Sequence, residues 1–257
     1  MKLIRYISIL LFSIMILLAG NTYAQKRGVM NLPAYNNARY HFGFILALNR
    51  MHFSVEMKEG FQNVVYDSLQ SPDVFADSLR LLYVDTKPTM GFTVGIVGNL
   101  KMSKYFDLRF VPSLAFGERY LDYYMLTYDD GESSFVEIRK SVTSAHIDFP
   151  LHVRYRSKRV HNFGAYVLAG AKYVLDLAAT RTQKTQEDNE TLLKLRKNDV
   201  AAELGVGIEF YNAWFKFGIE VKMSYGLFDL LQREDNVYTG GIESLHSKVW
   251  QLSFSFE

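Results

Sequence analysis

The final segment of the chain, residues 249–257, alternates strictly between large apolar and polar side chains. Neighbouring side chains of an extended strand point to opposite faces, so one face is apolar and the other polar. The apolar face carries Trp250, Leu252, Phe254 and Phe256. An uncovered aromatic face at the end of a chain is typical of a strand that closes a barrel in lipid.

The same period of two recurs along the chain and predicts eight strands. They cover residues 40–53, 89–102, 106–123, 142–156, 162–178, 199–211, 213–227 and 249–257. The gaps between them alternate in length. Residues 54–88, 124–141, 179–198 and 228–246 form long gaps, whereas 103–105, 157–161 and the turn at Asn212 are short. Outer-membrane barrels have this rhythm, with short periplasmic turns and longer extracellular loops.

We therefore predict an all-β protein, an eight-stranded antiparallel up-and-down transmembrane β-barrel over residues 40–257, with both termini periplasmic. The closing strand is expected to pair with residues 40–53. The inward faces carry many charges, which should pair and fill a lumen this narrow. They include Lys101, Arg109, Arg119, Asp148, Arg154, Lys172, Glu203, Glu209, Lys216, Glu220 and Lys222. A soluble lipocalin-like barrel, with an apolar interior, is the alternative.

The start of the chain has the features of a secretory signal peptide. Lys2 and Arg5 precede an apolar run over residues 7–18, and Thr22-Tyr23-Ala24 fits a cleavage site. We expect residues 1–24 to be removed and residues 25–39, with Lys26, Arg27 and Arg39, to form a periplasmic segment. A retained membrane anchor is the alternative, although the run is short for a spanning helix.

Composition agrees with a lipid-facing barrel. Aromatic residues make up 15% of the chain, as expected of interfacial aromatic girdles. The net charge of +2 does not suggest a nucleic-acid partner. The chain has no cysteine, which excludes disulfides, thiolate metal sites and a lipid-modified cysteine.

Three groups of polar residues are candidates for chemistry. His146, Asp148, His152 and Arg154 share one face of the fourth strand. The two histidines lie roughly 20 Å apart at ~3.3 Å per residue, so they cannot share a metal ion, and a luminal polar network explains them. Near the start of the last strand, the cluster of Glu243, Ser244, His246 and Ser247 is similar to the Ser, His and acid of some lipid A-modifying barrels, but ordinary loop polarity also explains it.

The first long gap mixes acidic and apolar residues. Asp67, Asp73, Asp77 and Asp85 are spaced too irregularly for a calcium loop. The apolar residues between them indicate a protein-contact surface, a folded cap or an ordinary surface loop. Residues 181–197 are highly polar and are expected to be solvated or partly disordered. We find no phosphate-binding loop, dinucleotide fingerprint, zinc-peptidase motif or nucleophile elbow, so we expect no catalytic, cofactor-binding or metal residues and no small-molecule substrate.

Several strings, in order, carry a family resemblance. They are Asn31-Leu-Pro-Ala-Tyr35, His41-Phe-Gly-Phe44, Gly91-Phe-Thr-Val-Gly-Ile96, residues 105–119, Asp148-Phe-Pro-Leu151, residues 155–159, Glu203-Leu-Gly-Val-Gly-Ile-Glu-Phe-Tyr211, residues 223–231 and Leu252-Ser-Phe-Ser-Phe-Glu257. Over residues 25–257 the chain resembles the PorT family of outer-membrane proteins. The resemblance implies a Gram-negative bacterium of the Bacteroidota type.

The resemblance also implies a non-enzymatic accessory or assembly role in type IX protein secretion. Its expected partners are outer-membrane lipids and other components of that secretion system. A general structural or adhesion barrel, a small-solute channel and a lipid A-modifying enzyme are the alternatives.

Overall fold

The computed structural model describes residues 30–67, 74, 76–179 and 193–257 of this chain. The predicted signal peptide, residues 1–24, lies outside the described residues, as do Lys26, Arg27 and Asp73. Within the described ranges, the helices are too short or too polar to span a bilayer.

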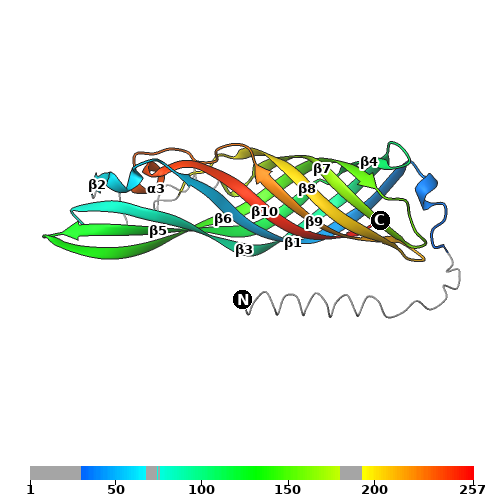
Figure 1. Ribbon diagram of the computed structural model, residues 1–257, viewed down its shortest axis with the longest axis horizontal. Helices are drawn as coiled ribbons and strands as arrows, with labels where there is room; N and C mark the ends of the chain where they lie inside the picture. The colour runs from blue at the N-terminus through cyan, green and yellow to red at the C-terminus, as the bar shows by residue number, and fades with distance from the viewer. Residues whose placement is uncertain (1–29, 68–73, 75, 180–192) are drawn as a thin grey trace, which may run out of the picture.

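The described chain forms one antiparallel sheet of long, tilted strands (Figure 1). The strands are β1 Tyr40–Met57, β2 Val65–Asp67, β3 Ser78–Lys101, β4 Phe106–Phe110, β5 Ser113–Asp129, β6 Glu132–Arg156, β7 Phe163–Asp176, β8 Asn198–Tyr211, β9 Lys216–Gly226 and β10 Ile242–Phe256. Short helices add η1 Tyr35–Asn37, η2 Phe61–Asn63 and α3 Val237–Gly240.

The sheet closes on itself through β1, which pairs with β10 on one side and with β3 on the other. Phe44 lies opposite Phe256 in the first pairing and opposite Ile96 in the second. The remaining strands pair in chain order around the ring. The expected partnership between the C-terminal strand and residues 40–53 is therefore confirmed.

The described sheet contains ten strand segments, where the sequence predicts eight. One difference is that the predicted third strand, 106–123, is divided at Val111 and Pro112. Proline has no N–H to donate to a neighbouring strand, so the ladder is interrupted there. β4 and β5 nevertheless lie between the same two neighbours, β3 and β6. The other addition is β2, which pairs only with the start of β3.

Three of the four predicted long loops are wrong in extent, because strands run far into them. Residues 54–88 contain the end of β1, β2 and the beginning of β3, and residues 228–246 contain α3 and the start of β10. Residues 124–141 belong entirely to a hairpin of β5 and β6, which projects at the end of the molecule away from the C-terminus (Figure 1). Its two turn residues, Asp130 and Gly131, have φ of 45° and 83°, the primed turn that suits twisted antiparallel strands.

Side-chain alternation follows the predicted directions around the ring. The outward residues form a belt of exposed apolar side chains, among them Phe42, Leu46, Phe92, Ile96, Leu151, Val206 and Trp250. Almost all of the charged residues predicted to face inward are buried, and Lys101 is half-buried. A polar interior inside an apolar exterior is the reverse of the lipocalin-like alternative.

The turn between β5 and β6 offers a direct test of the extended hairpin. Replacing Gly131 with Val places a β-branched residue at positive φ, and we expect the free energy of unfolding to fall by ~1–2 kcal/mol. Replacing it with Asn, which tolerates this backbone conformation, should have a smaller effect. Urea unfolding of the refolded barrel measures both variants, and equal effects would contradict the turn geometry.

Candidate functional site

The interior of the barrel is filled by ion pairs in successive layers. In the layer nearest the C-terminus, Arg154 contacts Asp107 at 2.7 Å and Glu209 at 2.5 Å. Beside it, the Lys216 ammonium lies 2.8 Å from the Glu257 carboxylate. These five side chains are at most 4% exposed. Charges buried this deeply require partners, so the layer is a structural unit that occupies the lumen.

The next layer is centred on Glu203 of β8. Lys172 lies 3.4 Å from Glu203 and 3.1 Å from Asp148, while Lys222 approaches Glu203 at 3.7 Å. His152 Nε2 lies 2.5 Å from the same carboxylate. Four strands, β6 to β9, therefore supply charges that meet near the middle of the lumen.

The third layer is built around Arg119 of β5. Its guanidinium lies 3.7 Å from Asp176 and 3.4 Å from His146 Nε2, and its Nε donates to Ser144 at 2.9 Å. The face of Phe53 covers it at 4.1 Å, a cation–π contact. Arg119 thus marks the boundary between the charged interior and an apolar cluster beyond it.

The four candidate residues of the predicted fourth strand all lie in this interior. His146 belongs to the Arg119 layer, Asp148 and His152 to the Glu203 layer, and Arg154 to the layer nearest the C-terminus. The histidines contact different carboxylates, Asp176 and Glu203. The expectation that they belong to a luminal polar network agrees with this placement.

The segment before β1 covers one mouth of the barrel. Tyr35 of η1 donates its hydroxyl to Glu257 at 3.3 Å and stacks on His41 with ring centroids 4.0 Å apart. Asn31 hydrogen bonds to Asn162 and to the carbonyl of Tyr211. The described part of the predicted segment 25–39 is therefore packed onto the barrel at residues 31–38.

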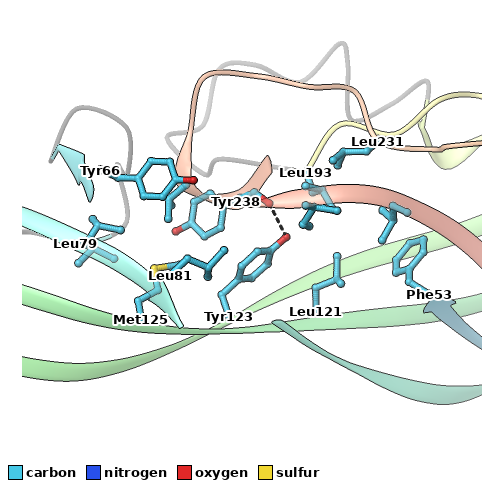
Figure 2. Close-up of a cluster of buried hydrophobic side chains, with 14 of the residues drawn as sticks. Phe53, Tyr66, Leu79, Leu81, Leu121, Tyr123, Met125, Leu193, Leu231 and Tyr238 are labelled. Atoms are coloured by element: carbon cyan, nitrogen blue, oxygen red, sulfur yellow. Dashed lines mark hydrogen bonds between the residues drawn. The ribbon is translucent and has the colours of Figure 1, made fainter. Parts of the chain in front are cut away.

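The opposite end is covered by a hydrophobic cap (Figure 2). Tyr123 of β5 donates its hydroxyl to the carbonyl of Tyr238 in α3 at 3.1 Å, and the two rings meet edge to face. Asn236 caps α3 by accepting a hydrogen bond from the Thr239 N–H at 2.9 Å. The cap also contains Phe53, Tyr66, Leu79, Leu81, Leu121, Met125, Leu193, Leu195, Leu230, Leu231, Val237, Ile242 and Leu245, all buried.

The cap settles the nature of two predicted gaps. Tyr66, Leu79 and Leu81, from the acidic first gap, are buried in it, so the folded-cap interpretation of that gap is confirmed. Leu193 and Leu195 come from residues 181–197, which were expected to be solvated. That expectation is wrong for these two residues, because they pack against the cap.

The strands β3, β5 and β6 carry the cap on one face. Their opposite, outer face is what we call the platform, defined by Tyr83, Lys87, Asp122, Tyr124, Phe135 and Arg139. The Tyr83 and Tyr124 rings stack with centroids 4.1 Å apart, and Tyr124 and Phe135 lie 5.9 Å apart. Below them, Asp122 pairs with Arg139 at 2.6 Å and with Lys87 at 2.7 Å. Hydrogen bonds from Arg139 and then Lys87 lower the pKa of Asp122 to about 2, so this carboxylate stays ionised.

Near the start of β10, the described structure shows no hydrogen bond between a serine and His246. Ser247 accepts a hydrogen bond from Arg119 inside the barrel, whereas the His246 ring stacks on Tyr225 on the outer wall. Their positions are adjacent in a strand, so their side chains point to opposite faces. Ser244 donates to Glu56 of β1, and Glu243 is exposed.

The acidic candidates in the described ranges do not form a group of three or more among themselves. Asp77 lies with Asp129 and Asp130, their carboxylate oxygens within 4.8 Å of each other on the exposed tip of the hairpin. Asp85 accepts from the Thr86 N–H. Among the candidates that the structure describes, Asp77 is the one in a group of three acids, and its neighbours come from the end of β5 and the turn after it.

Sequence reasoning offered a folded cap only for the first long gap, and it missed both the contribution of β5 and residues 230–245 to the cap and the whole of the platform. A usable signal was present in residues 121–131, where Leu121, Tyr123 and Met125 continue the period of two and Asp130-Gly131 marks a two-residue hairpin turn. The contribution of residues 230–245 had no comparable local signal, because α3 is held by contacts with distant strands.

The buried charge layers make a testable prediction about stability. Replacing Arg154 with Met leaves Asp107 and Glu209 without this partner, and we expect a loss of ~3–5 kcal/mol in the free energy of unfolding. Lys194, whose pair with Glu234 is partly exposed, is the matched control, and Lys194→Met should cost at most ~1 kcal/mol. Urea titration of the folded barrel distinguishes them, and a small loss for Arg154→Met would contradict the layered interior.

Comparison with known proteins identifies the family. No relative was found among the curated proteins compared with this chain. Among solved structures, the chain is similar to the outer membrane protein OprG from Pseudomonas aeruginosa, with 10% identity, 85% of this chain and 96% of that chain covered, and a TM-score of 0.37. The family model described as "Outer membrane protein beta-barrel domain" matches residues 23–232, which is most of the chain. The chain therefore belongs to the outer membrane protein β-barrel domain family and is an outer-membrane β-barrel protein.

Proposed function

We propose that this protein is an eight-stranded barrel that spans the outer membrane and serves, without catalysis, as an accessory or assembly component of type IX protein secretion. The secretion role draws on the sequence resemblance to the PorT family. The observation that carries the non-pore role is the closed interior, filled by charge layers and covered at both ends. Other secretion components are the proposed partners.

The eight-stranded count follows from treating β4 and β5 as one interrupted strand and β2 as an addition outside the ring. The start of β1 and the end of β10 then lie at the same end of the barrel, beside η1 and Glu257. We assign this end to the periplasm. The cap and platform then face the exterior, where outer-membrane barrels place their longer elements.

A closed lumen excludes a role as the route for folded cargo. Arg154, Glu203 and Arg119 each hold a layer of buried partners across it. Opening a passage would leave several of these charges unpaired, at a cost of several kcal/mol each. Cargo must therefore cross through another protein. The same closed lumen also disfavours a small-solute channel.

The unpaired edge of β6, beside the platform, supports a docking role for this barrel. β7 stops pairing with β6 at His146, while β6 continues back to Glu132. The carbonyl of Ala145 accepts from Leu177 on the β7 side, so the backbone groups of odd-numbered residues face that side. Between Ser133 and Arg139, these outward-facing backbone N–H and C=O groups pair with no strand among the described residues. An exposed edge of this kind accepts an extended segment of a partner by strand addition.

Two other functions are alternatives to the secretion role. A general structural or adhesion barrel uses the same fold without any contribution to secretion. A lipid A-modifying enzyme requires a serine beside its histidine. Ser247 points to the opposite face from His246, and Ser244 donates its hydroxyl to Glu56, so both observations disfavour this alternative.

The secretion role is tested by deleting the gene. We expect type IX cargo to disappear from the culture medium and accumulate in the periplasm, and the wild-type gene supplied in trans should restore export. Immunoblots of medium and periplasm measure both. Normal export from the deletion strain would leave only the general barrel function.

The docking edge is tested by complementing the deletion strain with Glu137→Pro. The Glu137 N–H faces the open side of β6, so proline there removes an edge donor and leaves the β5–β6 ladder in place. We expect cargo export to fall at least tenfold, while Glu137→Gln, which keeps the N–H, should restore export fully. Heat-modifiable gel mobility checks that both variants fold, and full export with folded Glu137→Pro would refute the edge as the docking site.

A further inference from the structure

The strands β1 and β10 run side by side (Figure 1). On their outer wall, a group of basic side chains lies where the apolar belt ends. Along β1 the outward residues change from Leu48 to Arg50 and His52. Along β10 they change from Trp250 to Lys248 and His246. We call Arg50, His52, Lys248 and His246 the basic rim.

The register brings these side chains together. His52 lies directly opposite Lys248, and Arg50 lies opposite Trp250, one diagonal step from Lys248. Directly opposed side chains of an antiparallel pair have Cβ atoms ~4.5–5.5 Å apart, and diagonal neighbours lie within reach of long side chains. The His246 ring stacks on Tyr225 of β9, and Tyr225 lies directly opposite Lys248 of β10.

Among the described residues, no carboxylate forms an ion pair with the two long cations of this group, Arg50 and Lys248. The Nδ1 atoms of His52 and His246 are covered yet have no hydrogen-bond partner. Glu56, the next acid on this face of β1, lies one diagonal step from His246 but further toward the cap than Arg50 and Lys248, and it accepts a hydrogen bond from Ser244. Cations on neighbouring strands repel one another, so the arrangement is favourable only with an external anion.

The platform shows the opposite arrangement. On that side of the barrel, Lys87 and Arg139 also sit beyond the apolar belt, but both contact the Asp122 carboxylate. Basic residues in similar positions are thus neutralised within the protein on one side and left open on the other.

The surroundings of the basic rim suit a lipid headgroup better than a soluble anion. Leu48 and Leu252 lie opposite each other immediately below it, on the exposed apolar wall that meets acyl chains. Trp250 is 45% exposed at the junction, and tryptophan prefers the boundary between hydrocarbon and headgroups. Arginine and lysine bind phosphate oxygens through charge-assisted hydrogen bonds, and basic residues at a membrane surface attract anionic lipids.

We infer that the basic rim binds the phosphate groups of a phosphorylated glycolipid of the outer leaflet, with its acyl chains against Leu48, Leu252 and Trp250. The choice of leaflet rests on the proposed orientation, in which the cap faces the exterior. Phosphate accepts from Arg50 and Lys248, and the rings of His52 and His246 flank these two cations.

The test is lipid binding by the purified full-length mature barrel in detergent, measured by native mass spectrometry with added diphosphoryl lipid A. We expect the double variant Arg50→Gln/Lys248→Gln to bind lipid A at least tenfold more weakly than wild type. The matched control, Lys87→Gln/Arg139→Gln, removes two cations that Asp122 already neutralises and should bind as wild type does. Gel mobility verifies that each variant is folded.

Competing lipids identify the ligand. Phosphatidylcholine should bind at least tenfold more weakly than lipid A, and equal binding would show that acyl chains alone are recognised and overturn the inference. If phosphatidylglycerol binds as tightly as lipid A, the ligand is not specifically a glycolipid, and the assignment is overturned. If millimolar inorganic phosphate displaces lipid A, the basic rim recognises free phosphate, and the assignment to a lipid is overturned. Because binding is measured without secretion, a failed secretion role leaves this result unaffected.

Discussion

Closure of the sheet through β1 is the constraint on which the rest of this structure depends. A strand that faces lipid on one side can leave no backbone N–H or C=O unpaired, and β1 removes both edges by pairing with β10 and β3. Once the ring is closed, inward side chains lose contact with bulk water. Charged residues there must find partners inside, and the layers around Arg154, Glu203 and Arg119 are the result.

The ring stops being a complete barrel where β3, β5 and β6 continue past their neighbours. Inward positions there no longer face a lumen crowded with charge. They carry Leu81, Tyr123 and Met125, which need an apolar covering, and the chain around α3 supplies it. The cap is thus a small hydrophobic core built on the end of a polar barrel. Arg119, with Phe53 over its guanidinium, lies where the two kinds of interior meet.

The outer surface changes character along the same axis. The apolar belt gives way to a basic rim on β1 and β10, whereas the platform on β3, β5 and β6 pairs its own charges through Asp122. The proposed contacts therefore differ in kind around the barrel. The basic rim is suited to lipid phosphate, and the open edge of β6 beside the platform is suited to an extended protein segment.

The sequence by itself determined the strands within the apolar belt, their inward and outward faces, the polar interior and the pairing of the last strand with the first. These follow from side-chain alternation, a local property with a period of two. Only the tertiary structure decided how far the strands run beyond the belt, that residues 31–38 cover one mouth, and that Tyr123 meets Tyr238 at the other. Those features depend on contacts between residues far apart in the chain, such as Tyr35 with Glu257, which no local pattern records.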